Sequence, residues 1–509
     1  MKKITSAFLA AMIAIQLTGC SQAASGSKPA ASSPGQIESE SAQTNLSELN
    51  EEINGEITVS SYQSMSYESF LKEAAEKFEK KYPGTKVNID SLQKMPEIKT
   101  MEKDGVSLAV ATIEEDPQAE SDYIFKVSND IMSGAGADIY AMDILPYLKY
   151  AKGGYLEDLA PYMEDDPEFN FSEYKQNVID AVKYNGKQLI MPLDYSFNLF
   201  TYNKDIIPEG KEALFPNKDL FSLSDIINTG KQELDNGSYA AEDEVKILNF
   251  EKTQLFRTLF EDSYKRFVNH ENNTADFNSQ SFINLLQSVQ EISDSGYINE
   301  DYFSGNAHQD ITFEQIQTMM SKLYLFSFDG SYSLLRFIAD NKPEIFYNSI
   351  SSTSENSELL GIKTNEDQNV EGTYFHLLGM NANSKNKQTA WAFIKFLLSE
   401  EMQNSNNLFS TPVHNGARAE KARLEVLGEL HYSPEQRTNQ EMTEEQKAVY
   451  DEYLSLLEAY SDMINAYTPI DTKIWQIVQD ECEPYFKGNK TAEQVAEAIQ
   501  GRVNLYMNE

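Results

Sequence analysis

Residues 55–154 alternate between strand patterns and helix patterns, and this alternation constrains the fold more than any other feature. Ile57 and Val59 alternate with polar residues, which is typical of a half-buried strand. Apolar residues then recur three or four positions apart in residues 70–78, which predicts an amphipathic helix that Pro83-Gly84 ends. Further strands and helices follow in the same alternation. The sequence therefore predicts an α/β fold with a parallel sheet covered by helices.

Two other regions have a different pattern. Residues 104–120 are acidic and irregular, and we interpret them as an insertion. From Leu248 onward helical spacing dominates, and Trp391 and Trp475 both lie within such spacing, so we expect them in the core.

The amino-terminal nineteen residues predict a secretory signal. Lys2 and Lys3 precede an apolar segment that is too short to span a bilayer as a stable helix. The segment ends in Leu-Thr-Gly-Cys20, which resembles the lipobox of bacterial lipoproteins. That resemblance implies cleavage of residues 1–19, a lipid on Cys20 and anchoring at the extracellular face of the cell membrane. The alternative is that Cys20 is an ordinary small residue near an ordinary cleavage site.

Residues 20–54 are interpreted as a lipidated cysteine and a disordered tether. The stretch is rich in Ser, Ala, Gly, Pro, Gln and Glu and lacks the apolar spacing that a core requires. A flexible chain of this length has a root-mean-square reach on the order of 30 Å. It would hold a globular body off the membrane but near a membrane partner.

Composition narrows the possible partners. The chain has 80 acidic and 42 basic residues and a formal charge of -38, which argues against nucleic acid because binding a phosphate backbone requires a basic patch. There are two cysteines, and if Cys20 is acylated the fold has no intrachain disulfide. Cys482 lies in a helical stretch, and we expect it to be a buried small apolar side chain.

Six segments, in order along the chain, resemble one protein family. They are GEITV with FLKEAAEKFEKKYPG (55–59 and 70–84), SGAGADIY (133–140), GYLEDL (154–159), YNGKQLIMP with FTYNKD (184–192 and 200–205), TAWAFIKFLLS (389–399) and FKGNKT (486–491). The family is that of the extracellular solute-binding proteins of ABC importers, in the carbohydrate-type group that includes maltose-binding protein. Residues 103–122 and 408–443 depart from the family pattern.

The resemblance implies a fold and a mode of action. It implies the two-lobed, periplasmic-binding-protein-like fold of type II, in which each lobe is a mainly parallel sheet covered by helices. The ligand would lie in a cleft between the lobes, and hinge closure would bury it. The lobes would comprise approximately 55–195 with 379–420, and 196–378 with 421–509. The chain would cross between them near 193–200 and 375–380.

A sugar site requires flat apolar faces for the ring and charged or amide groups for the hydroxyls. In α/β sheets such groups follow the carboxyl ends of strands. Tyr62 follows the first strand, where the alternative is a solvated loop. Asp143 follows a later strand and resembles a carboxylate that binds sugar hydroxyls in this family. The alternative is that Asp143 is the N-cap of the next helix. The remaining candidates lie at the crossovers or after a strand in the second lobe: Asp194, Tyr195, Asp329, Tyr332 as the stacking ring, and Tyr374.

The sequence favours a binding protein rather than an enzyme. The five histidines are dispersed, and no zinc, Walker A or nucleophile-elbow motif occurs, so we expect no metal and no cofactor. The expected function is a monomeric, membrane-anchored protein that captures a small solute, an oligosaccharide by resemblance, for an ABC permease. An extracellular glycoside hydrolase is the first alternative, because 80 acidic residues leave room for a carboxylate pair. A ligand-sensing lipoprotein that partners a receptor is the second.

Overall fold

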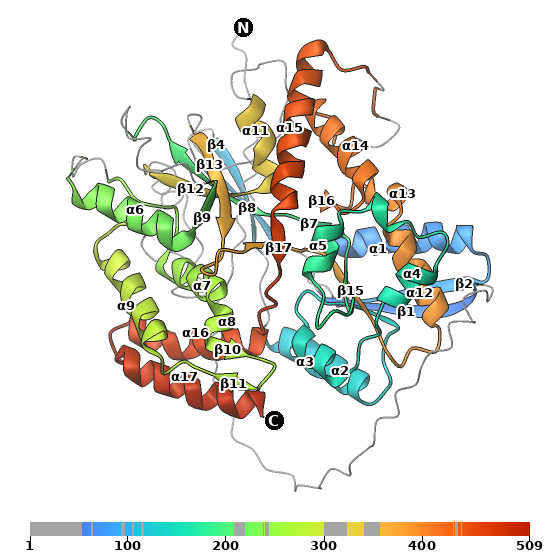
Figure 1. Cartoon of the computed structure of the whole chain (residues 1–509), viewed down its shortest axis with the longest axis horizontal. Helices are drawn as coiled ribbons and strands as arrows, with labels where there is room; N and C mark the ends of the chain where they lie inside the picture. The colour runs from blue at the N-terminus through green and yellow to red at the C-terminus, as the bar shows by residue number, and fades with distance from the viewer. Residues whose placement is uncertain are drawn as a thin grey trace, which may run out of the picture.

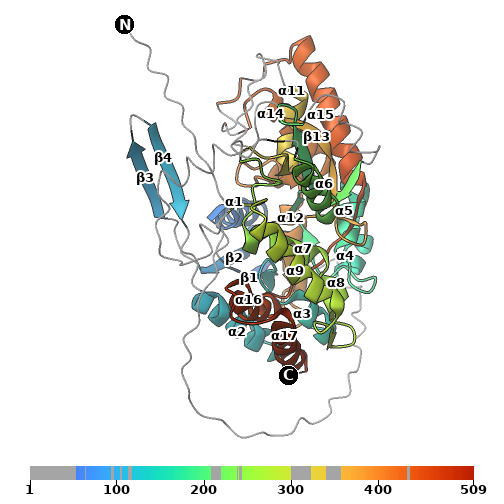
Figure 2. The ribbon, with the colours of Figure 1, turned by 90° about the vertical axis from the view of Figure 1, so that its left-hand side faces the viewer.

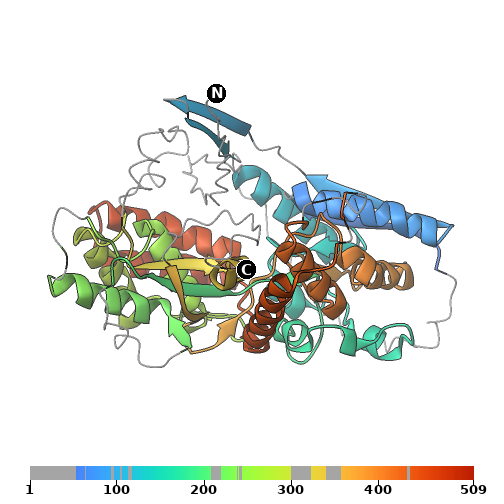
Figure 3. The same cartoon turned by 90° about the horizontal axis from the view of Figure 1, so that it is seen from above.

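The chain forms two lobes that lie side by side, each a β-sheet with helices packed against it (Figure 1, Figure 3). The computed structural model describes residues 53–62, 65–92, 97–103, 106–112, 117–207, 219–237, 239, 244–299, 323–339, 357–430, 432, 436–438 and 440–508. The predicted signal peptide, Cys20 and the tether as far as residue 52 lie outside them. The two-lobed α/β architecture is the one that the sequence predicted.

The sheet of the first lobe has five strands in the order β2-β1-β5-β15-β6. They are β1 (Gly55–Tyr62), β2 (Thr85–Leu92), β5 (Ile139–Ala141), β6 (Met191–Pro192) and β15 (Leu377–Met380). β1 pairs in parallel with β2 and with β5, as predicted. β15 pairs antiparallel with both β5 and β6, because the chain returns from the second lobe in the opposite direction.

Helices cover both faces of this sheet. They are α1 (Met65–Lys81), α2 (Pro117–Met132), α3 (Tyr147–Gly153), α4 (Ala160–Asp165), α5 (Gln176–Ala181), α12 (Lys387–Leu397) and α13 (Glu400–Gln403), with the 3-10 turn η2 (Phe171–Glu173). Phe70 and Phe78 on α1 are fully buried, as the helical spacing predicted. Trp391 on α12 is also buried, and its indole N–H donates to Asp166 Oδ2 at 2.9 Å, which satisfies the ring's polar atom inside the core.

The sheet of the second lobe has four strands in the order β12-β8-β13-β9. They are β8 (Asn198–Asn203), β9 (Leu220–Ser222), β12 (Phe326–Gly330) and β13 (Ser357–Thr364). β8 pairs antiparallel with β12 and with β13, and only β13 and β9 are parallel. The second sheet is therefore more mixed than the mainly parallel sheet that the sequence suggested.

Helices and small hairpin strands surround this second sheet. They are α6 (Leu223–Asp235), α7 (Lys252–Asp262), α8 (Tyr264–Phe267), β10 (Val268–Asn269), β11 (Thr274–Ala275), α9 (Gln280–Asp294), η5 (Ser331–Ser333), α11 (Leu334–Ala339), α16 (Thr472–Phe486) and α17 (Ala492–Met507). Phe256, Phe260 and Phe282 are buried in the core of this lobe. Cys482 is buried there with a free thiol, as predicted, and Trp475 packs at its margin.

Three segments of chain connect the lobes. The first contains β7 (Asp194–Tyr195), which pairs with β16 (Thr411–Pro412). The second contains β14 (Val370–Glu371) and returns to the first lobe, and the third contains β17 (Ile464–Ala466), which pairs with β14. Ser196 and Thr373 form a further bridge between the first and second segments. The junction is therefore a set of short, mutually paired strands.

Two long helices, α14 (Asn415–Val426) and α15 (Glu444–Asp462), lie over this junction (Figure 1). α15 packs against α11 of the second lobe and against α14. On its other side Lys175 Nζ contacts Glu458 Oε2 at 2.8 Å and Asp462 Oδ1 at 2.6 Å. The helix thus touches parts of both lobes, and the assignment of residues 421–509 to the second lobe stays a prediction.

The prediction that residues 104–120 are irregular was wrong. β3 (Glu97–Lys103) and β4 (Val106–Thr112) pair antiparallel as a hairpin, and α2 begins at Pro117. The hairpin projects from the first lobe (Figure 2). Among the described helices, none is long and apolar enough to cross a membrane.

Candidate ligand site

Asp143 lies just beyond β5, at the edge of the first lobe. The backbone N–H of Met142 donates to Leu377 O at 2.9 Å, which fixes this edge beside the return strand. The Asp143 side chain is exposed. Surrounding protein nevertheless raises its pKa to about 7 by desolvation, while nearby His376 opposes the rise. Because water reaches the carboxyl, solvent screening reduces this shift.

Asp194 and Tyr195 lie in the first crossover and are fully buried. Asp194 Oδ2 is 2.5 Å from His376 Nδ1, and Asp194 Oδ1 accepts from the backbone N–H groups of His376 at 3.1 Å and Phe375 at 3.3 Å. The Tyr195 hydroxyl donates to Ser461 Oγ at 2.8 Å. Both predicted ligand residues are thus engaged with protein partners in this structure, where they hold the crossover together.

His376 was not singled out by the sequence, yet it is central to this region. Burial lowers the pKa of its imidazole, but the Asp194 carboxylate outweighs burial and raises the pKa above its ordinary value. The ring of Tyr67 lies against the imidazole, with centroids 4.4 Å apart. His376 and Asp194 are 182 positions apart, so no local motif could have indicated the pair.

Tyr62 and Tyr374 are packed more tightly than a sugar platform requires. Tyr62 is 6% exposed, and its ring lies 5.1 Å from that of Tyr123. Tyr374 is half-buried, its hydroxyl donates to Val178 O at 2.9 Å, and its ring meets Tyr467 edge to face at 5.2 Å. In this structure both rings support the first lobe and its junction, and their role as ligand contacts stays a prediction.

Asp329 and Tyr332 lie at the facing edge of the second lobe. The ring of Tyr332 is 62% exposed. It passes so close to Gly330 that a Cβ there would be 2.4 Å from Tyr332 Cε1, so a side chain at position 330 would displace the ring. Asp329 is buried, accepts from the Ser333 hydroxyl at 3.2 Å and has no partner for Oδ2 among the described residues. Burial raises its pKa to about 6, against the smaller opposing effects of Ser333 and Arg336.

The two edges meet at the first crossover. The hydroxyls of Ser196 and Ser331 are 2.9 Å apart, which fixes the Tyr332 turn to the crossover two residues after Asp194. Asp143 is close enough to His376 and Asp194 for their charges to affect its pKa. An exposed carboxyl of one lobe and an exposed aromatic ring of the other therefore flank one crossover. Together they offer a hydrogen-bonding group and an apolar face.

The described part of the chain contains no group of three or more His, Cys, Asp or Glu side chains arranged to hold a metal ion. The side chains described in this region carry carboxyl, hydroxyl, imidazole and aromatic groups.

Comparison with known proteins identifies a family and a fold. The sequence model of the bacterial extracellular solute-binding proteins matches residues 98–411, more than half of the chain. This is a family of binding proteins rather than of enzymes, in agreement with the sequence analysis. No curated protein matches the chain by sequence.

Solved structures share the fold at low sequence identity. An ABC substrate-binding protein from Listeria monocytogenes in complex with cycloalternan is 18% identical, with a TM-score of 0.51 over 89% of this chain and 99% of that one. A family 1 extracellular solute-binding protein from Alicyclobacillus acidocaldarius is 15% identical, with a TM-score of 0.52 over 90% of this chain and 100% of that one. The sugar-binding protein MalE from Xanthomonas citri is 12% identical, with a TM-score of 0.52 over 89% of this chain and 98% of that one. These likenesses confirm the two-lobed α/β fold.

Proposed function

Because the chain belongs to the bacterial extracellular solute-binding proteins, we propose that it captures an oligosaccharide between its two lobes and delivers it to the permease of an ABC importer. The observation that carries the proposal is the placement of Asp143 and Tyr332. These exposed side chains come from opposite lobes and flank the same crossover. A ligand that contacts both would favour a closed arrangement of the lobes, since binding shifts a conformational equilibrium towards the state with more contacts.

The ligand class rests on chemistry and on the relatives. A sugar ring presents apolar C–H faces to an aromatic ring and hydroxyls to carboxyl groups, and Tyr332 and Asp143 offer one of each. Two of the structural relatives are described as a cycloalternan complex and as a sugar-binding protein. Asp194, Tyr195, Tyr62 and Tyr374 then support the site from within the protein, and they become ligand contacts only if opening of the lobes exposes them.

Closure requires a hinge, and the three paired crossover segments are suited to it. They are short, and they carry the connection between two lobes that each have their own sheet. Hinge motions concentrate backbone changes in a few residues at the ends of such elements. We place the lobes at approximately 55–195 with 379–420 and 196–378 with 421–509.

The same proposal includes the anchor. Residues 1–19 would be removed, Cys20 would carry lipid, and residues 20–54 would tether the monomeric body to the outer face of the cell membrane. A tether with a reach on the order of 30 Å raises the local concentration of the loaded protein near its permease. Labelling with a radioactive fatty acid tests this, with Cys20→Ala as the unlabelled control.

A thermal-shift screen against oligosaccharides, monosaccharides and peptides tests the ligand class. A ligand at a hundredfold excess over its Kd stabilises the protein by about 2.7 kcal/mol. We expect a saturable shift with one or more oligosaccharides, and chromatography of the mixture should return the sugar intact. A shift with peptides alone would overturn the ligand class, and release of hydrolysis products would favour a glycoside hydrolase.

A further inference from the structure

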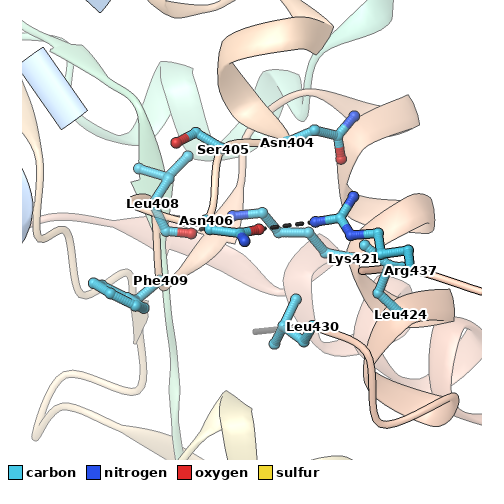
Figure 4. Close-up of a pocket in the computed structure, with 9 residues that line it drawn as sticks. All are labelled: Asn404, Ser405, Asn406, Leu408, Phe409, Lys421, Leu424, Leu430 and Arg437. Carbon is cyan, nitrogen blue, oxygen red and sulfur yellow. Dashed lines mark hydrogen bonds between the residues drawn. The ribbon is translucent and has the colours of Figure 1, made fainter. Parts of the chain in front are cut away.

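A small pocket lies beside α14 (Figure 4), and none of its lining residues is a predicted ligand residue. Its free volume of about 20 Å³ accommodates one small occupant. Its polar lining comes from the turn after α13 and from Lys421 and Arg437, and Phe409 and Leu430 form apolar walls. The same turn leads into β16, which pairs with the crossover strand β7.

Lys421 is a buried cation without a counter-ion in this pocket. Its side chain is 9% exposed, and its ammonium group donates to Leu408 O. No carboxylate of the described residues lies within ion-pair distance of it, although the chain has 80 acidic residues and 42 basic ones. Lysine is rarely buried without a paired charge, because desolvating an ammonium costs several kcal/mol. Burial accordingly lowers its pKa to about 7; the more distant Asp194 opposes this effect and Arg437 adds to it.

Arg437 brings a second cation to the pocket, again without an acidic partner in the described part of the chain. Its Nη2 donates to Asn406 Oδ1 at 2.8 Å, and its Nε donates to Tyr432 O at 3.2 Å. Both acceptors are neutral. Asn404 contributes a buried amide whose Oδ1 has no hydrogen-bond partner among the described residues. Rotation of that amide by half a turn would present its NH₂ group as a donor.

We propose that this pocket is a binding site for a small monovalent anion, a carboxylate group or a halide, held by Lys421 and Arg437. Lys421 and Arg437 have only neutral partners, and the Asn404 amide, once rotated, adds a third donor, so the three groups can surround one acceptor. A water molecule fits the volume but leaves both charges uncompensated, whereas an anion compensates them and forms charge-assisted hydrogen bonds. The inference is independent of the proposed sugar function.

Thermal shift of the intact protein at constant ionic strength tests the site. The background salt is the sodium salt of 2-(N-morpholino)ethanesulfonic acid, whose anion carries a bulky sulfonate and no carboxylate, and it is replaced stepwise by sodium acetate or sodium chloride. We expect a saturable rise in Tm with acetate and with chloride, and none with acetamide, the neutral analogue of acetate. In Lys421→Met the affinity for acetate should fall by about tenfold or more, the effect of losing one charge-assisted bond.

The control is Lys385→Met, which removes the same unit charge from an exposed lysine with no ion pair among the described residues. This variant should respond to acetate as the wild type does. If Lys421→Met does not fold, Arg437→Gln provides the same comparison from the rim of the pocket. An equal response in the wild type and the pocket variant, an equal response to acetamide, or a response that does not saturate would each overturn the proposal.

Discussion

The imidazole Nδ1 of His376 lies 2.5 Å from the Asp194 carboxylate, and neither side chain is more than 6% exposed. The pair joins the first crossover to the end of the second, so it ties together two of the three connections between the lobes. Since both partners are buried, each leaves the other with an unpaired polar group if it is removed.

We therefore predict that Asp194→Ala destabilises the protein by roughly 3–5 kcal/mol, the cost of breaking a buried pair from one side. Asp194→Asn keeps the shape and one oxygen that can accept from the backbone N–H groups of Phe375 and His376, so it should cost less. Urea unfolding followed by circular dichroism measures both. Equal stability of Asp194→Ala and the wild type would show that the pair does not hold the junction.

The same pair predicts a pH dependence. The pKa of His376 is raised in the folded state, so its stabilising contribution is complete below the ordinary value of about 6.5 and is lost as the pH rises through the raised pKa. The difference in unfolding free energy between wild type and His376→Gln should therefore shrink from pH 6 towards pH 9. Burial also raises the pKa of Asp143 and lowers that of Lys421, so both residues should be left intact in this comparison.

Tyr332→Ala should weaken binding of the sugar identified by the screen by about tenfold, because it removes an exposed stacking face. Tyr332→Phe keeps the ring and should stay within about threefold of wild type. Calorimetric titration gives the affinities. Phe125→Ala is a matched control, since Phe125 is 69% exposed on α2 and belongs to no predicted ligand contact. Equal weakening by both alanine variants would contradict the assignment.

Asp329 predicts a second pH effect, of known sign. Its folded pKa of about 6 is above the ordinary value of 3.8, so the folded protein loses stability as the pH rises from about 4 to about 6. Asp329→Asn carries no ionisable group and should remove that loss, a gain on the order of 2 kcal/mol at pH 7 and almost none at pH 4. Urea unfolding of ligand-free protein at the two pH values measures it. The idea fails if the gain is the same at both.

Two helical glycines should respond in opposite directions to alanine. In α6 a Cβ at Gly230 would be 2.6 Å from Ile247 Cγ2, so Gly230→Ala should destabilise by about 1–3 kcal/mol through overpacking. In α17 a Cβ at Gly501 meets nothing within 4 Å, so Gly501→Ala should stabilise by roughly 0.5–1 kcal/mol through lower backbone entropy in the unfolded chain. Melting temperatures distinguish the two. A gain at Gly230 would mean that α6 shifts away from Ile247.

The sequence predicted the first lobe well, because its signals are local. Alternation at Ile57 and Val59 and helical spacing on α1 depend on neighbours in the chain, and the structure buries these side chains as expected. The antiparallel partners of β8 could not be predicted in this way, since period-two alternation identifies a strand but not the strand beside it. The hairpin of β3 and β4 was missed because acidic residues nearby were interpreted as a loop.

At the candidate site, too, features that depend on neighbouring residues were predicted and contacts between distant residues were not. Asp143 and Tyr332 were found from the ends of strands and from family resemblance, and both are exposed beside the crossover. Burial of Asp194 by His376 depends on a contact between residues 182 positions apart, which no spacing rule detects. Whether each predicted residue touches a ligand stays a prediction.

The position of β15 has a consequence for how this protein matures. β15 lies between β5 and β6 in the first sheet, although its sequence follows all four strands of the second sheet. The first sheet therefore cannot be completed until Met380 is available, and pairing over such a separation is slow because a large loop must close first. A chain leaving the cell amino terminus first would remain incompletely folded through most of its export. With the anchor proposed at Cys20, the amino-terminal end would thus reach the membrane before either lobe can bind a solute.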